Sequence, residues 1–322
     1  METRKLGKTD LEVSVLCMGT MQFGWTADEP TSIEVLNASF EAGINFIDTA
    51  DIYSNWVENN PGGVSEQIIG KWMLKHRIPR DQVVIATKVR GPMGADKRQG
   101  LSHKHIIESV EGALERLNTD YIDLYQSHWP DEETPIEETL EAYALLIEQG
   151  KVRYIGCSNY PAWRLMQALW AADHYGTVRY DTLQPHYNLV HRQEFERELA
   201  DVCREYRIGV IPYSPLAGGF LTGKYRKGSP IPERSRGQSS ERVRGYFTDR
   251  NWELLDEMER IGSQKGGYSI SQVALAWQIS NPLITAPIIG PKDMAQLEDN
   301  LGAAELRLDP AEMDHLNHLS GL

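Results

Sequence analysis

Four side chains that can handle protons follow three short apolar runs. Asp48 and Tyr53 follow INFI, Lys88 follows VVIAT, and His128 follows IDLYQS. A tyrosine with a pKa of ~10 is by itself a slow proton donor at neutral pH, but a lysine ammonium within hydrogen-bond reach would lower that pKa. An aspartate would keep such a lysine charged and oriented, and a histidine could hydrogen-bond a carbonyl oxygen. The set therefore suits protonation of an alkoxide, and it lacks only a source of hydride.

The same residues also have a purely structural interpretation. Taken singly, Asp48, Lys88 and His128 could each be a strand-end residue in a structural ion pair, because buried charges need partners. Their common position at the ends of apolar runs, together with the spacing from Asp48 to Tyr53, favours one shared site.

Composition and charge restrict the classes of partner. The chain has 322 residues, 41% hydrophobic and 25% charged, as in ordinary globular proteins. Its formal net charge of -13 argues against non-specific binding to nucleic acid or to an anionic membrane, because both need a basic surface. Three cysteines without metal-ligand spacing, and no signal peptide or apolar membrane span, predict a reducing, cytoplasmic setting and no metal site.

Apolar segments of strand length alternate with helical patterns along the chain. The expected strands are residues 14–19, 45–48, 83–87, 121–127, 154–157, 182–185, 209–213 and 285–289. The expected helices between them are residues 31–42, 65–76, 103–117, 136–149, 161–173, 192–206, 270–279 and 293–301. Strict alternation implies parallel strands joined by right-handed crossovers.

This pattern predicts an α/β fold, a (β/α)8 TIM barrel forming a single domain over residues 1–322. A hairpin around Gly7 and Lys8 precedes the barrel, and extra helices are expected at about residues 249–262 and 310–319. An open doubly wound sheet is the alternative, but GTMQFG at residues 19–24 does not fit the glycine-rich turn of that fold. Chemistry in a barrel lies at the carboxyl ends of the strands, where all four proton-handling residues are expected.

Seven motifs extend the argument beyond this set. FIDTADIYS, IATKV, QSHWP, YIGCSNY, LQPHYN, PYSPLAGGFLTGKY and PIIGPKDMAQLEDN occur in that order between about residue 14 and residue 302. Together they resemble the successive signatures of the aldo-keto reductase superfamily, in which an N-terminal hairpin plugs the bottom of the barrel. The resemblance implies NADPH-dependent reduction of a small-molecule carbonyl substrate. It also implies that Tyr53 is the general acid, that Lys88 and Asp48 tune it, and that His128 orients the carbonyl.

The resemblance further implies a binding site for NADP(H). Ser158, Asn159 and Gln184 should hold the nicotinamide carboxamide, and Tyr213 should stack on the nicotinamide ring. Lys292 would suit the adenosine 2'-phosphate, with Arg236 as a second candidate, which favours NADPH over NADH. The remaining expected cofactor contacts are Gly19, Thr20, Asp48, Ser214, Leu216, Gly218, Lys224, Gly290, Gln296 and Asn300.

Two alternatives and the substrate stay open. Potassium-channel β-subunits resemble this family and act chiefly as regulatory partners, and a barrel without cofactor could use the same residues for aldolase- or isomerase-type chemistry. Specificity depends on loops 54–63 and 220–248, whose shapes the sequence does not give. Asparagines in the first loop hint at hydroxylated substrates, and Trp25, Trp56 and Trp129 are candidate walls of a substrate pocket. Association into a homo-oligomer is also left open.

Overall fold

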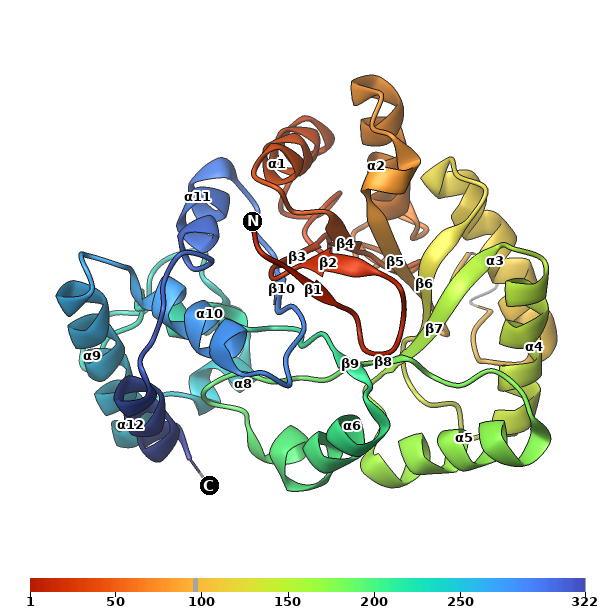
Figure 1. The fold of residues 1–322 in the computed structure, drawn as a ribbon. Coiled ribbons are helices and arrows are strands. Elements are labelled where there is room, and N and C mark those ends of the chain that lie inside the picture. Colours follow the sequence, from red (N-terminus) through yellow and green to blue (C-terminus); the bar gives the residue numbers. More distant parts are fainter. Residues whose placement is uncertain (95–97, 322) are drawn as a thin grey trace.

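The strands form one closed ring. The computed structural model describes residues 1–94 and 98–321. Within them, eight parallel strands lie in the order β10-β3-β4-β5-β6-β7-β8-β9 (Figure 1). Their bounds are β3 Cys17–Gly19, β4 Phe46–Asp48, β5 Val84–Val89, β6 Ile122–Ser127, β7 Val152–Ser158, β8 Thr182–Gln184, β9 Gly209–Val210 and β10 Ile288–Ile289. A parallel bridge from Val210 to Ile284 and a 2.9 Å bond from the Ile288 amide to the Pro212 carbonyl join the two ends. The expected (β/α)8 barrel is confirmed.

Helices surround the ring. The barrel helices are α1 Glu29–Glu41, α2 Val64–His76, α3 His103–Leu117, α4 Ile136–Glu148, α5 Ala162–Tyr175, α6 Ala200–Tyr206, α10 Ile270–Ser280 and α11 Met294–Gly302. The helix expected over residues 192–206 is not continuous, because a π-helical turn, Phe195–Leu199, precedes α6. The long connection after β9, residues 216–248, holds α7 Arg236–Ser239 and α8 Glu241–Gly245. Helix α9 Asp249–Gln264 follows it, and α12 Pro310–Ser320 packs against α9. No helix among the described residues is long and apolar enough to cross a membrane.

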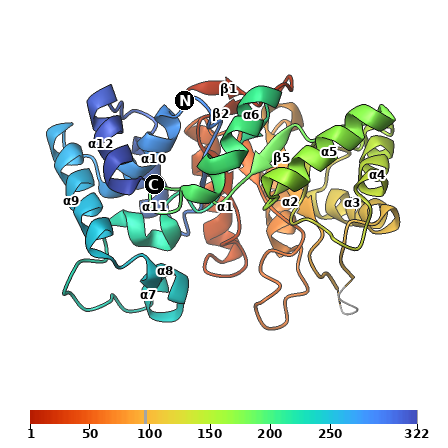
Figure 2. The ribbon, with the colours of Figure 1, turned by 90° about the horizontal axis from the view of Figure 1, so that it is seen from below.

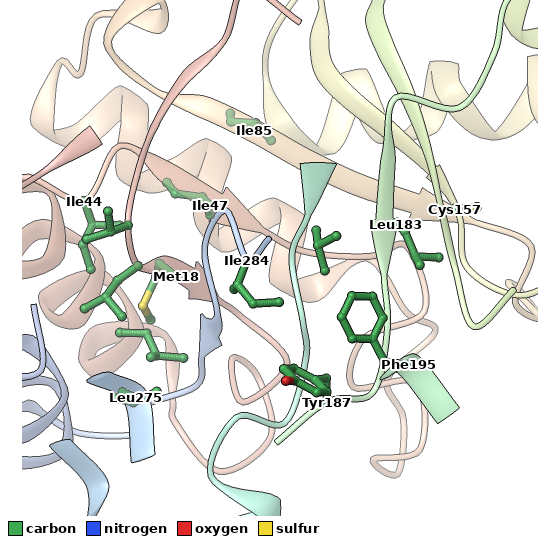
Figure 3. Packing of buried hydrophobic residues seen from close by; sticks show 14 of the residues in the cluster. Met18, Ile44, Ile47, Ile85, Cys157, Leu183, Tyr187, Phe195, Leu275 and Ile284 are labelled. Carbon is green, nitrogen blue, oxygen red and sulfur yellow. The ribbon is translucent and has the colours of Figure 1, made fainter. Parts of the chain in front are cut away.

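Alternate residues along each strand face opposite sides, as the two-residue period of a strand requires. Outward-facing residues join the larger hydrophobic cluster under the helices (Figure 3). This cluster includes Met18, Ile47, Ile85 and Leu183. The intervening residues face the barrel interior, and several of them belong to a second, smaller cluster.

The N-terminal hairpin fills one end of that interior. Strands β1 (Thr3–Lys5) and β2 (Glu12–Ser14) pair antiparallel, so the expected hairpin is confirmed, although its second arm begins where residues 1–12 end. Leu6 and Val13 are fully buried in the smaller cluster. Gly7 has φ +59° and a Cβ there would lie 2.6 Å from the Gly209 amide nitrogen, so the turn requires glycine.

The opposite end of the interior is polar. The inward-facing residues nearest the carboxyl ends of four strands are Asp48, Lys88, Gln126 and Gln184. All four are buried. Figure 2 shows the hairpin at one end of the barrel and the loops after β4 and β5, with α7 and α8, at the other. The change from apolar to polar residues along the interior therefore marks the end that carries the candidate site.

Candidate active site

Lys88 lies at the centre of the site and contacts three acceptors. Its Nζ lies 2.5 Å from Asp48 Oδ2, 2.8 Å from the Thr49 carbonyl oxygen and 2.9 Å from the Tyr53 hydroxyl. The Lys88 and Asp48 side chains are 0% and 1% exposed. An ammonium has three protons to donate, and each is directed at one of these oxygens. The phenol, ammonium and carboxylate expected to meet at one end of the barrel therefore do so.

A pair of glutamines holds the other carboxylate oxygen. Gln184 and Gln126 donate from Nε2 to Asp48 Oδ1 over 2.9 and 3.1 Å. Gln184 Nε2 also lies 3.3 Å from Gln126 Oε1. Both oxygens of Asp48 are thus used within the protein, which fixes the orientation of the carboxylate toward Lys88.

Burial changes the expected direction of the Tyr53 pKa. The Lys88 ammonium does favour the phenolate, but the loss of solvent around the hydroxyl outweighs it and raises the pKa of Tyr53 to about 12. The lowered pKa expected from the sequence is therefore wrong in direction, because burial of the hydroxyl has a larger effect than the ammonium charge. For Lys88, burial alone would lower the pKa, but Asp48 and Tyr53 outweigh burial and raise it. Tyr53 therefore holds its proton at neutral pH beside a firmly charged ammonium.

His128 follows β6 and faces Tyr53. The two rings lie 6.0 Å apart between centroids at 73°, and the imidazole stacks on Trp129 at 3.8 Å. Burial first, then the charges of Lys88 and Arg90, lower the pKa of His128 well below its usual value. Its Nδ1 is buried without a hydrogen-bond partner among the described residues. A neutral imidazole of this kind can donate one N–H to a carbonyl oxygen.

A cavity opens beside these groups. It has a volume of about 490 Å³ and is lined by Ile52, Arg90, Pro92, Trp129, Pro130 and Asn159. Several of these residues adjoin Tyr53, His128 and Ser158 in the chain, so the cavity lies next to the proton-handling groups. Trp129 is one of its walls, as the sequence predicted. Trp25 and Trp56 instead pack edge to face at 5.4 Å and are 43% and 47% exposed.

The residues expected to hold a nicotinamide form one hydrogen-bonded group. Asn159 donates to the His128 carbonyl oxygen at 3.0 Å and accepts from the Tyr213 hydroxyl at 2.8 Å, while the Ser158 hydroxyl donates to the Gln184 carbonyl oxygen at 2.9 Å. His186 stacks on Tyr213 at 5.1 Å and 13°. Because His186 covers one face of the Tyr213 ring, another ring could stack only on the opposite face.

Four cations gather along the long connection and at the start of α11. Burial lowers the pKa of Lys224, and the neighbouring charges of Arg236 and Lys292 lower it further. The pKa of Arg236 is lowered in the same way by burial and by Arg242. Neighbouring cations in a protein of net charge -13 add local positive charge, which favours an anion there. Lys224, Arg236 and Lys292 were expected here, whereas Arg242 was not.

The other predicted contacts lie in three places. Gly19 ends β3, Thr20 follows it, and both are buried. The Thr20 hydroxyl is used within the protein, donating to the Asp48 carbonyl oxygen and accepting from Ser65. The remaining residues lie in the 214–218 turn and around α11: Ser214, Leu216, Gly218, Gly290, Gln296 and Asn300.

The N-terminus of α11 is less open to an outside anion than its position suggests. Asp293 caps the helix by accepting from the Gln296 amide at 3.0 Å, and the Gln296 side chain accepts from the Lys292 amide at 3.2 Å. These two bonds use backbone amides that would otherwise face a phosphate. Recognition of a phosphate there would depend on the Lys292 side chain.

The residues present fit a nicotinamide dinucleotide. The hydroxyl and amides of Ser158, Asn159 and Gln184 are of the types that bind a carboxamide, which would exchange with some of their present partners. Tyr213 offers an aromatic face, and the four cations match phosphates. Gly218 and Gly219 have φ of +65° and +95°, which lets the chain turn sharply at this site. Among the described residues, no cluster of three or more histidine, cysteine or acidic side chains could hold a metal ion.

Gln126 and Arg242 belong to the site but were not predicted from the sequence. Gln126 lies in QSHWP two residues before His128, so the two-residue strand period could have identified it as inward-facing. Arg242 lies in the long connection, where no regular spacing of apolar residues indicates which way its side chain faces.

Comparison with known proteins gives a consistent result. The model of the Aldo/keto reductase family matches residues 15–320. The chain is 39% identical to an uncharacterized oxidoreductase, YrpG, of Bacillus subtilis, covering 99% of this chain and 96% of the relative. It is 33% identical to versiconal hemiacetal acetate reductase of Aspergillus parasiticus, covering 98% and 96%. It is also 34% identical to a probable voltage-gated potassium channel subunit beta of Arabidopsis thaliana, covering 99% and 96%.

Proposed function

The chain belongs to the aldo/keto reductase family, and we propose that it reduces an aldehyde or ketone to the alcohol with NADPH as the hydride source. The observation that carries this proposal is the contact of the Tyr53 hydroxyl with Lys88 Nζ at 2.9 Å, beside the cavity. A protonated phenol held by a charged ammonium is a proton donor whose conjugate base is stabilised as it forms.

The protein groups divide the work as follows. His128 donates an N–H to the substrate carbonyl oxygen, which orients the carbonyl and spreads its growing negative charge. A nicotinamide cofactor held by Ser158, Asn159, Gln184 and Tyr213 would supply the hydride for the carbonyl carbon. Tyr53 gives its O–H proton to the resulting alkoxide oxygen, and the phenolate left behind lies 2.9 Å from the Lys88 ammonium. Asp48 keeps that ammonium in place, and Tyr53 regains a proton from solvent.

The preference for NADPH over NADH is part of the proposal. The 2'-phosphate that distinguishes NADPH adds negative charge, and Lys224, Arg236 and Lys292 supply positive charge close together. A lysine contributes a point charge rather than a bidentate fork, so we expect a preference and not an absolute requirement.

We assign the reaction to a reducing, cytoplasmic compartment. The three cysteines Cys17, Cys157 and Cys203 are free and buried, so none of them needs an oxidising environment. The partner we expect is a small carbonyl compound rather than nucleic acid or a membrane, because the net charge is -13.

A regulatory subunit that binds cofactor is the second candidate. Relatives from Arabidopsis thaliana and rice, each 34% identical, are named as probable voltage-gated potassium channel subunits beta. The complete proton-donating set and the adjoining cavity favour the enzyme. Aldolase- or isomerase-type chemistry would leave the cation cluster without a purpose, so we rank it below both.

The decisive experiment measures NADPH absorbance with a panel of small aldehydes and ketones, for the wild-type protein and for Tyr53→Phe. We expect turnover by the wild type and a loss of roughly 10²–10⁴-fold in kcat for the variant, the usual contribution of general acid catalysis. NADPH binding, followed by tryptophan fluorescence, should be kept in both. Binding without turnover of any carbonyl would favour the regulatory subunit, and absence of NADPH binding would refute the reductase.

A further inference from the structure

A single cation lies in the wall of the substrate cavity. Arg90 follows β5 two residues after Lys88, so it projects from the same strand end. Among the described residues that line the cavity, Arg90 alone carries a charge, and Ile52, Pro92, Trp129 and Pro130 form apolar walls. The Arg90 charge reaches the reaction centre, because it helps to lower the pKa of His128.

The Arg90 guanidinium has no carboxylate partner in the described part of the chain. Its Nε is buried without a hydrogen-bond acceptor, and none of the carboxylates among residues 1–94 and 98–321 forms an ion pair with it. The Arg90 charge acts electrostatically on the Asp131 carboxyl. That carboxyl, however, already accepts from the Leu101 amide at 2.8 Å and from Thr134 Oγ1 at 2.8 Å. A buried guanidinium donor without an acceptor is costly, so the site favours an anionic ligand.

The backbone at Arg90 is strained, which is unusual for an arginine. Its φ is +128°, a region that glycine adopts readily and that other residues avoid. The Gly100 amide holds this conformation by donating to the Arg90 carbonyl oxygen at 3.0 Å. The next residue, Gly91, is pressed against Ile52, since a Cβ there would lie 2.4 Å from Ile52 Cγ2. A glycine would fit position 90 without strain, so the presence of arginine calls for a role of its side chain.

We propose that Arg90 determines specificity by binding a carboxylate or phosphate group of the carbonyl substrate. This inference rests on the proposed reductase function and adds the class of substrate. The carbonyl would lie against Tyr53 and His128, an apolar body against Trp129, and the anionic group against the planar fork of Arg90. In a protein of net charge -13, an anionic substrate needs such a local cation.

The cofactor cations are a separate group. The charges of Arg236 and Lys292 help to lower the pKa of Lys224, and that of Arg242 helps to lower the pKa of Arg236. Arg90 is not among the charges that act on Lys224 or Arg236. Loop 54–63, whose asparagines hinted at hydroxylated substrates, also contacts the cavity rim. Asn55 Nδ2 donates to the carbonyl oxygen of Pro92, a cavity residue, at 3.1 Å.

The test compares matched anionic and neutral aldehydes. One pair is 4-formylbenzoate and its methyl ester, and the other is 4-formylphenyl phosphate and 4-methoxybenzaldehyde. For the wild type we expect kcat/KM to be about 10–100-fold higher for the anion in at least one pair, as a charge-assisted hydrogen bond provides. The pair with the larger ratio identifies carboxylate or phosphate. A ratio at or below one in both pairs would overturn the inference.

Three variants test whether the preference for anionic aldehydes depends on Arg90. Arg90→Gly removes the guanidinium and fits the +128° backbone, so it should fold and its ratio should fall toward one. Arg90→Lys should keep part of the preference, since it retains the charge without the fork. The control Arg77→Gly removes one positive charge from another positive-φ arginine, φ +52°, at the end of α2, and should keep the wild-type ratio. A preference that survives Arg90→Gly would contradict the assignment.

A binding measurement separates this inference from the proposed function. The Kd ratio of the same aldehydes, measured by calorimetry on Tyr53→Phe protein with NADP present, does not depend on turnover. Turnover of neutral aldehydes without an anion preference would refute only the Arg90 assignment. Lack of turnover with all four aldehydes would refute the reductase for these substrates, while the Kd ratio would still decide the role of Arg90.

Discussion

Lys88 and Asp48 form a buried ion pair at the centre of the candidate site. Both side chains are almost completely buried, so their desolvation must be offset by their attraction and by hydrogen bonds. Thr49, Tyr53, Gln126 and Gln184 supply those bonds. The pair is therefore a fixed charge arrangement, and Tyr53 is the member of the site positioned to move a proton.

Breaking this pair from one side should be expensive. Lys88→Met leaves the Asp48 carboxylate buried without its ammonium, and we expect a loss of about 3–5 kcal/mol in the free energy of unfolding. The double variant with Asp48→Asn should cost less than the sum of the two single changes by about 1–3 kcal/mol. Urea denaturation measures all three, and additive costs would show that the two groups act independently.

The pH dependence of reduction follows from two pKa directions. Tyr53 has a pKa of about 12, so it remains protonated up to about pH 11, and His128, whose pKa is lowered, remains neutral down to about pH 6. The kcat for carbonyl reduction should therefore stay nearly flat between those limits, whereas alcohol oxidation, which needs the phenolate, should rise with pH. A tenfold fall in the reduction rate per pH unit above about pH 8 would contradict the raised Tyr53 pKa.

The sequence predicted the chemical types of this site but not their environment. Asp48, Tyr53, Lys88 and His128 could be assigned to strand ends because apolar runs precede them. The raised Tyr53 pKa depends on how much solvent reaches the hydroxyl, and that depends on packing from the whole barrel. Arg90 could not be recognised either, because its positive φ and its orientation into the cavity arise from the loop that follows β5.

At the scale of single elements, the turn after β9 matters because it precedes Lys224 and fixes the position of its ammonium. The 3-10 segment Ala217–Thr222 contains Gly218 and Gly219, both with positive φ. A Cβ at Gly219 would lie 2.6 Å from Lys224 Nζ, so this glycine leaves room for the ammonium. The conformation of the turn and the position of the cation therefore depend on each other.

Gly219→Ala should weaken cofactor binding more than it weakens the fold. We expect the Kd for NADPH to rise about 10-fold as Lys224 is displaced, equivalent to roughly 1.4 kcal/mol. The matched control is Gly176→Ala, which has φ +62° and nothing within 4 Å of its Cβ. It should lose about 1 kcal/mol of stability from strain alone and keep the wild-type Kd. Equal changes in Kd for Gly219→Ala and Gly176→Ala would show that the turn has no specific role in cofactor binding.

Helices and strands whose apolar residues recur at a regular spacing were predictable from the sequence, and segments without such a spacing were not. Helix α3 begins and ends at His103 and Leu117 as expected, because its apolar residues follow a clear helical spacing. The expected helix over residues 192–206 is interrupted by a π-helical turn, a local change that hydrophobic period does not detect. The long connection 216–248 holds α7 and α8, and no repeating pattern in its sequence indicated them.

At the scale of the whole molecule, the apolar plug formed by the N-terminal hairpin and the candidate active site lie at opposite ends of the barrel. Figure 2 shows the hairpin at one end of the barrel. There Leu6, Leu11 and Val13 are buried in the interior cluster, and the buried polar groups lie at the carboxyl ends of the strands, at the other end. Arg4 adds hydrogen bonds of 2.8 and 2.9 Å to the carbonyl oxygens of Ile279 and Ile284, next to the seam that closes the ring. This separation lets the loops around the site vary without loss of the core.

Leu6→Ala should test that separation. Leu6 is 0% exposed, so truncation should cost about 2–5 kcal/mol in the free energy of unfolding. Below the unfolding transition, kcat should change by less than about twofold, since the site lies at the other end. Leu74→Ala is the control, because Leu74 is 62% exposed and its loss should matter by no more than about 0.5 kcal/mol. A large kcat effect for Leu6→Ala would show that the two ends are coupled.

The central claim is that hydride from the cofactor and a proton from Tyr53 reduce a carbonyl in this barrel. A single-turnover reaction with NADPH that carries deuterium at both C4 positions of the nicotinamide tests it most directly, with mass spectrometry of the alcohol. We predict that deuterium appears on the former carbonyl carbon with the wild type, and that Tyr53→Phe binds the cofactor but forms no labelled alcohol in the same time. Unlabelled alcohol from the wild type, or labelled alcohol formed as fast by Tyr53→Phe, would contradict the account.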